Sequence, residues 1–162
     1  YTPGVSDPSK DIETAREAIR TQIGKRGNTV LLSAQAWKAV KQHPKIIDRI
    51  KYTGRDSVTV EMLAALWDGD KVVVGDAVYT DAAGTMTDVW GKFVVVAYTN
   101  LGSVADLGEP TYGYPYRLDG APYVEQGYED RNAKSDIYPV TDEVQPVLTA
   151  AISGYLISAA VA

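Results

Sequence analysis

The sequence predicts an α+β fold in which a mixed sheet is flanked by short helices. Segments with helical periodicity come first, up to Trp67, and segments rich in β-branched and aromatic residues follow from Asp70 onward. This order favours an α+β fold over a regularly alternating parallel one. The chain has 162 residues, of which 45% are hydrophobic and 23% are charged. Because this size and composition are typical of one folded domain, residues 1–162 are expected to form a single structural unit.

The first predicted helix runs from Pro8 to Ile23. Asp7 is a favourable N-cap, proline is favoured at the first helical position, and Gly24 fits the C-terminal stop. One face of this helix is apolar and carries Ile12, Ala15, Ile19 and Ile23. Residues Thr29–Ser33 begin with β-branched side chains and are bounded by turn residues, which indicates a buried strand.

Three shorter helices are predicted between Ser33 and Trp67. Ser33 caps the first of them, which ends at His43 because the residue before a proline is pushed out of the helical region. Pro44 begins the second helix, and Thr59 caps the third. The third helix carries an apolar stripe, interpreted as core packing, that consists of Met62, Leu63, Leu66 and Trp67.

Four later segments are predicted to be strands: Lys71–Gly75, Phe93–Tyr98, Tyr112–Arg117 and the closing apolar stretch. Residues that favour turns, mainly Gly, Asp and Pro, separate them. The closing stretch, Val147–Ala162, carries no charge, but it is shorter than the ~20 residues of a spanning helix and is interrupted by Ser153-Gly154. It therefore predicts paired strands and no membrane anchor.

Charge is distributed unevenly along the chain. The formal net charge is −5, but residues 1–60 hold eleven Lys/Arg against six Asp/Glu, whereas residues 61–162 hold five against fifteen. The acidic total argues against a nucleic-acid binder. Opposite potentials on the two parts suit contacts between identical copies, although unrelated solvated faces explain the same numbers equally well.

The sequence contains no motif for catalysis, nucleotide binding or metal binding. Cysteine is absent, which excludes disulfides and thiolate chemistry, and the sole histidine, His43, has no second histidine with which to bind a metal. Gly84 and Gly91-Lys92 have the wrong spacing for a phosphate loop. Asp68-Gly69-Asp70 lacks the rest of a calcium loop and is interpreted as a turn. We therefore expect no cofactor and no enzymatic activity. The alternative is a hydrolase that uses scattered carboxylates, and loss of its turnover on substitution of Asp136 by Asn would support it.

Three tyrosines alternate along the predicted strand that begins at Tyr112, the other two being Tyr114 and Tyr116. In a strand these side chains would share one face. Such a face suits stacking on a sugar, and it also suits packing on the core or on a neighbouring chain, where tyrosine is enriched. Packing is the preferred interpretation, and a carbohydrate- or cell-wall-binding β-rich module is the alternative.

Four segments are distinctive in combination. They are NTVLLSAQAW at 28–37 with HPKIIDRIK at 43–51, VEMLAALW at 60–67 with KVVVGDAVY at 71–79, DVWGKFVVVAY at 88–98, and YEDRNAKSD at 128–136 with the closing strands. In this order and spacing they resemble the major capsid proteins of tailed phages, whose shells share the Hong Kong phage-type coat fold. The resemblance covers nearly the whole chain.

The resemblance implies a structural subunit of a phage or prophage icosahedral capsid. Such a subunit is made in the bacterial cytoplasm, becomes part of the virion, and assembles with copies of itself into hexamers and pentamers around DNA, which is a partner only indirectly. No catalytic residue, metal or cofactor is implied. The resemblance also implies that Phe93–Tyr98 is a central strand of the axial domain, buried on both faces, with Trp90 anchoring one end and protein backbone close to Gly91.

The likeness to the coat proteins begins at Asn28. The N-terminal arm, extended loop and spine helix of that family are not recognised before this residue, so the chain resembles a C-terminal fragment. Such a fragment would hold the axial domain and strands that return to the peripheral domain, and it is expected to be monomeric in isolation. Candidate contacts between subunits are Lys45, Arg49, Arg55, Tyr112, Tyr114 and Tyr116, of which the three basic residues are expected to face acidic loops of the next copy.

Overall fold

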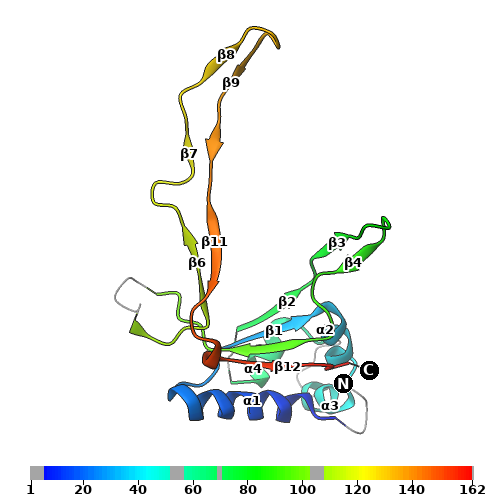
Figure 1. Ribbon diagram of the computed structural model, residues 1–162. Coiled ribbons are helices and arrows are strands. Elements are labelled where there is room, and N and C mark those ends of the chain that lie inside the picture. Colours follow the sequence, from blue (N-terminus) through cyan, green and yellow to red (C-terminus); the bar gives the residue numbers. More distant parts are fainter. Residues whose placement is uncertain (1–5, 52–56, 69–70, 103–107, 162) are drawn as a thin grey trace. The chain divides into compact units, whose positions relative to one another are not determined.

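The computed structural model describes residues 6–51, 57–68, 71–102 and 108–161. Contacts within the chain group it into two compact units: unit 1 contains residues 1–112 and 150–162, and unit 2 contains residues 113–149. Among the described residues, unit 1 holds every helix, whereas unit 2 holds only strands and turns (Figure 1). The assignment of residues 1–162 to a single structural unit, an axial domain with C-terminal strands that return to the peripheral domain, stays a prediction.

Four α-helices are described in unit 1, and their ends follow the predicted signals: α1 (Pro8–Ile23), α2 (Ala34–Lys41), α3 (Pro44–Ile50) and α4 (Val60–Leu66). The Asp7 side chain caps α1 by accepting a hydrogen bond from the backbone N–H of Lys10 at 3.3 Å. Gly24 ends α1 in the left-handed conformation, with φ at 73°, which glycine adopts without strain. The hydroxyls of Ser33 and Thr59 cap α2 and α4, as predicted.

A four-stranded mixed sheet in the order β12-β5-β1-β2 lies at the centre of unit 1. Strand β1 (Thr29–Ser33) runs parallel to β2 (Lys71–Gly75) and antiparallel to β5 (Val94–Ala97). Strand β12 (Gly154–Ile157) follows a short 3-10 helix, η3 (Ala151–Ser153), and pairs antiparallel with β5. The predicted α+β class with a mixed sheet and short helices is confirmed, and so is the central place of β5.

The two faces of this sheet differ in burial. On one face, residues of the three strands β1, β2 and β5 form a buried set: Val30, Leu32, Val72, Val94 and Val96. On the other face Val95 is only partly buried, Val73 is 38% exposed and Leu156 is 58% exposed. On this second face of β5 Ala97 is buried, but Phe93 is 40% exposed. The expectation that the strand is buried on both faces is therefore wrong at Phe93 and Val95, because the side chains of the helices cluster with the first face.

The hydrophobic core lies between that buried face and the helices. Each of the four helices contributes to it, together with a residue close to the end of the described chain: Ile12, Ala15, Ile19, Ala36, Val40, Ile46, Ile50, Leu63, Trp67 and Ala160. The predicted apolar faces of α1 and α4 thus serve core packing. Of the described helices, none has both the length and the hydropathy that a crossing of a membrane demands.

A small hairpin joins β2 to β5 and is formed by β3 (Val78–Thr80) and β4 (Met86–Asp88). A backbone hydrogen bond of 2.9 Å from Val89 N–H to the Ala77 carbonyl closes its base. The Gln35 side chain on α2 donates a hydrogen bond of 3.1 Å to the Asp88 carboxylate. The base of the hairpin is therefore tied both to itself and to a helix.

Aromatic rings fill the space beside two glycines at the base of this hairpin. The Trp90 ring lies close to Gly75: a Cβ atom on residue 75 would be only 2.7 Å from the Cδ1 atom of Trp90. Trp90 therefore contacts the end of β2. At Gly91 an added Cβ would meet the Phe93 ring at 2.8 Å. The expectation of protein backbone next to Gly91 is wrong, because the nearest atoms belong to an aromatic side chain two residues away.

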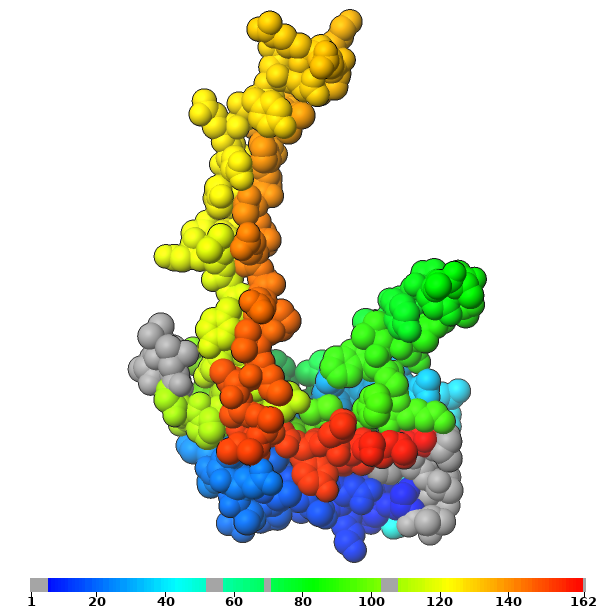
Figure 2. Space-filling view, in the orientation of Figure 1, coloured from blue at the N-terminus to red at the C-terminus, as the bar shows by residue number. Residues whose placement is uncertain are grey.

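Unit 2 is a narrow β-ribbon, drawn in yellow and orange in Figure 2. Three antiparallel strand pairs follow one another along it: β6 (Gly113–Arg117) with β11 (Val144–Leu148), β7 (Tyr123–Val124) with β10 (Val140–Thr141), and β8 (Tyr128–Asp130) with β9 (Ser135–Ile137). Because β11 pairs with β6 and β12 with β5, the closing apolar stretch does form paired strands, as predicted.

Candidate functional site

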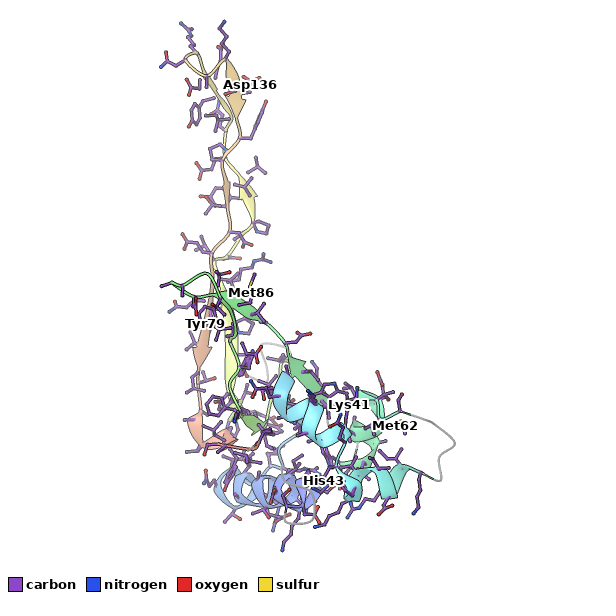
Figure 3. The ribbon with its side chains drawn as sticks, turned by 90° about the vertical axis from the view of Figure 1, so that its right-hand side faces the viewer. Lys41, His43, Met62, Tyr79, Met86 and Asp136 are labelled. Carbon is purple, nitrogen blue, oxygen red and sulfur yellow. The ribbon has the colours of Figure 1, made fainter. Side chains whose placement is uncertain are left out.

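Two of the three predicted basic contact residues, Lys45 and Arg49, lie on α3, which follows the His43 corner labelled in Figure 3. Lys45 forms an ion pair of 3.2 Å with Asp7 of the same chain, whereas Arg49 is exposed and Arg55 lies outside the described residues. Partial desolvation raises the pKa of Asp7, but hydrogen bonds from Lys10 and Lys45 and the charges of Lys45 and Arg49 together hold that pKa below its ordinary value. Lys45 is thus already engaged inside its own chain.

The three alternating tyrosines do not form one row. Tyr112 belongs to unit 1, where its ring lies against Gly154: an added Cβ there would stand 2.2 Å from the ring. Tyr114 and Tyr116 share a face of β6, with ring centroids 6.3 Å apart and planes at 65°. This edge-to-face pair is a packing arrangement, whereas stacking on a sugar needs rings presented flat to the ligand.

The residues that could suggest catalysis or metal binding serve the fold. His43 is 1% exposed, and its Nε2 atom lies 3.3 Å from the Ser6 hydroxyl. Asp68 has φ at 60° and pairs with Arg16 at 3.4 Å, while Gly69 and Asp70 lie outside the described residues. Across residues 6–51, 57–68, 71–102 and 108–161, the acidic and histidine side chains form no group that could hold a metal ion.

The surface that sequence reasoning missed is the exposed apolar surface of unit 2. Among its residues, not one is buried. Nine large apolar or aromatic side chains are instead exposed: Tyr116, Leu118, Tyr123, Val124, Tyr128, Tyr138, Val140, Val144 and Leu148. The short strands between turn residues were a usable signal, but a strand pattern gives no information on whether its apolar side chains are covered within the same chain.

Unit 2 also carries an acidic excess, with three Lys/Arg against seven Asp/Glu in residues 113–149. One pair is internal: Arg117 holds Asp142 by two hydrogen bonds of 3.0 and 2.7 Å. Those hydrogen bonds, followed by the charge of Arg117, lower the pKa of Asp142. A ribbon that combines exposed apolar side chains with a net negative charge suits a partner that is both apolar and basic.

A second exposed apolar surface lies on the β3–β4 hairpin, which the sequence analysis did not predict. Val78 is 54%, Tyr79 51%, Met86 70% and Val89 55% exposed. The turn residues between Thr80 and Met86, including Gly84 at φ 81°, were the available signal. The described residues thus offer two exposed apolar surfaces, one on unit 2 and one on the β3–β4 hairpin.

Comparisons with known proteins indicate the family of the chain. The family model of phage major capsid protein E matches residues 2–135. A major capsid protein of the Burkholderia phage BcepMu is 41% identical over 161 residues, which cover 98% of this chain and 52% of that protein. The solved structure of a phage-related protein from Bordetella bronchiseptica RB50 has a TM-score of 0.87 at 46% identity, over 96% of this chain and 52% of the other.

The chain spans about half the length of both relatives, 52% in each case. The family match, in contrast, covers most of the chain itself, from residue 2 to residue 135. Together with 41% identity over nearly its whole length, this match is sufficient to assign the family. The chain belongs to the phage major capsid protein E family.

Proposed function

We propose that the protein is a structural subunit of a phage or prophage shell, assembling with copies of itself into hexamers and pentamers around DNA. It is made in the bacterial cytoplasm and ends in the virion. Family membership supports the structural role. The observation that carries the proposal in the structure itself is unit 2, a ribbon of apolar strands in which no residue is buried.

A two-stranded ribbon without a core is marginally stable in water, because at least a third strand or a packed face is needed for independent stability. Exposed apolar patches of this kind mark sites of association between proteins. In a capsid, neighbouring subunits or another part of the same subunit supply the missing surface. The apolar ribbon therefore supports assembly rather than a function of the isolated chain.

Charge supports a head-to-tail contact between copies. The part of the chain up to residue 60 is basic and the part beyond it is acidic. A contact between two different patches of the same protein is heterologous, and it closes into a ring when the rotation between copies is suitable. Hexamers and pentamers are rings of this type. Arg49 is exposed and, unlike Lys45, forms no ion pair with the described residues, so its charge is available for such a contact.

The first test asks whether the protein, expressed at the full length of its reading frame, forms particles. We expect closed shells or capsomer rings in negative-stain electron microscopy and a fast-sedimenting species in a gradient. A protein that remains monomeric at every concentration and salt tested would contradict the proposal.

The second test removes most of the apolar ribbon. Leu118–Glu143 are replaced by Asn-Gly, which fits a two-residue hairpin because Arg117 and Val144 are paired opposite each other. We expect unit 1 to keep its cooperative melting transition while particles are lost. Normal particles from this variant would show that unit 2 is not needed for assembly and would overturn the role assigned to it.

A further inference from the structure

The β3–β4 hairpin combines an apolar surface with negative charge. Val78 and Met86 lie on one face of it, because Val78 pairs with Asp88 and Thr80 pairs with Met86. Tyr79 lies on the opposite face and is 51% exposed. Between Lys71 and Lys92 the chain contains three aspartates and no Lys or Arg, so the whole projection is acidic.

The hairpin is held firmly at its base and turn. Two backbone N–H groups, of Ala83 and Thr85, each donate to Asp81 Oδ1 at 2.9 Å, which fixes the turn. Asp88 is engaged by Gln35. Asp76, in contrast, is exposed at the base of the hairpin, and its carboxylate forms no hydrogen bond or ion pair with the described residues. The projection is therefore preorganised, which lowers the entropy cost of docking on a partner.

A surface of the opposite character lies on α2. Lys38 and Lys41 are exposed and, within the described part of the chain, neither forms an ion pair. Lys41 Nζ lies 5.4 Å from the centroid of the Trp37 ring, so a cation covers a partly buried aromatic side chain. This basic surface of α2, formed by Trp37, Lys38 and Lys41, offers both positive charge and apolar area.

The two surfaces cannot meet within one copy. Gln35 near the start of α2 binds Asp88 at the base of the hairpin, and Lys41 is six residues further along the helix, about 9 Å at 1.5 Å per residue. From that base the hairpin, with Tyr79 and Met86, extends away from Lys41 (Figure 3). Complementary surfaces that point apart on one molecule suit a contact between two molecules.

We infer that the β3–β4 hairpin of one copy docks on the basic surface of α2 in a neighbouring copy. The inference rests on the proposed function and deepens it by naming both sides of one contact between subunits. It moves the basic side of that contact from α3, where Lys45 is already paired with Asp7, to Lys38 and Lys41. The contact is heterologous and therefore compatible with a ring.

Cross-linking in assembled particles tests the contact directly. The chain contains no cysteine, so Met86→Cys and Lys41→Cys introduce a defined pair for a short bismaleimide reagent. The matched control combines Met86→Cys with Lys10→Cys, because Lys10 is an exposed lysine on α1. We expect dimers and higher ladders from the first pair, and at least about tenfold less product from the control.

Reversal of charge provides an independent test. Asp76→Lys and Lys41→Glu are each expected to lower particle yield by about tenfold, because each single variant places like charges opposite each other in the contact. The double variant is expected to restore the yield. Lys10→Glu should leave it unchanged.

The outcomes separate the inference from the proposed function. Particles that form normally but give no more Met86–Lys41 product than the control, or a double variant no better than either single variant, would overturn the inference and leave the capsid role intact. A parent protein that forms no particles would overturn both.

Discussion

Unit 1 and unit 2 are built from the same kinds of residue but are stabilised in different ways. Unit 1 buries apolar side chains of four helices and one sheet face in a single cluster. Unit 2 contains comparable apolar residues, yet none of them is buried. The difference shows that apolar content alone does not indicate a core; what matters is whether a second layer lies within the same chain.

The contrast also separates two uses of apolar surface. In unit 1, burial of apolar surface stabilises the fold by about 25 cal/mol for each Å² removed from water. In unit 2 the apolar side chains stay exposed, and our proposal assigns them to a partner; backbone hydrogen bonds across the ribbon hold its shape in the isolated chain. Substitutions at matched residues should therefore affect folding in unit 1 and association in unit 2.

The largest expected effect is a buried charge in unit 1. Val96→Asp places a carboxylate at a 0% exposed site of β5, which should cost more than about 4 kcal/mol and prevent folding. Val140→Asp, at a 63% exposed site of β10, should change stability by no more than about 0.5 kcal/mol. Thermal melts and expression as soluble protein measure both. A soluble, cooperatively melting Val96→Asp variant would contradict this account of the core.

A smaller effect is expected when a leucine is truncated. Leu63→Ala removes a 0% exposed side chain of α4 and should destabilise unit 1 by about 2–5 kcal/mol through the cavity it leaves. Leu148→Ala, at a 57% exposed site of β11, should change the free energy of unfolding little and lower particle yield instead. Equal losses of stability, measured by denaturant unfolding, would remove the distinction between the units.

The smallest expected effect concerns pH. Hydrogen bonds from Tyr98 (2.7 Å), Asn100 (2.9 Å) and Lys25 (3.3 Å), with the Lys25 charge, hold the pKa of Glu109 in unit 1 below its ordinary value. A lowered folded-state pKa contributes stability that is fully present above the pKa of the unfolded chain and is lost as pH falls through the folded-state value. Glu109→Gln should therefore melt lower at neutral pH and show less acid dependence.

The matched variant in unit 2 is Asp142→Asn. Arg117 lowers the pKa of Asp142 by the same kind of hydrogen bond, but both side chains lie in the ribbon without a core. We expect no change in the melting temperature of unit 1 at any pH between 3 and 8 for this variant. If Asp142→Asn changed the acid dependence more than Glu109→Gln, the two units would not be stabilised independently.

Local signals made the helices of unit 1 predictable. Asp7 with Pro8, Ser33, His43 with Pro44, and Thr59 each mark a boundary that the structure confirms. These signals act through backbone groups within a few residues, so they can be recognised in the sequence without knowledge of the fold. The resemblance to phage coat proteins is confirmed by the family match, and with it the expectation of a structural protein rather than an enzyme.

Long-range contacts were not predictable in the same way. Val95 was expected to be as buried as Val94 and Val96, but which face of a strand is covered depends on helices far away in the sequence. The Phe93 ring beside Gly91 and the placement of Tyr112 apart from Tyr114 were missed for the same reason. That the chain is a C-terminal fragment stays a prediction, as do the contacts proposed for Arg49.

The central claim, that unit 1 is stable by itself and unit 2 is completed by association, is tested most directly by hydrogen exchange. Amides of β5 and β11 are compared in the isolated chain and in assembled particles. The account predicts that β11 amides in the isolated chain open at a cost below about 2 kcal/mol, far less than β5 amides, and become strongly protected in particles. Amides of β11 that are as protected as those of β5 in the isolated chain would contradict it.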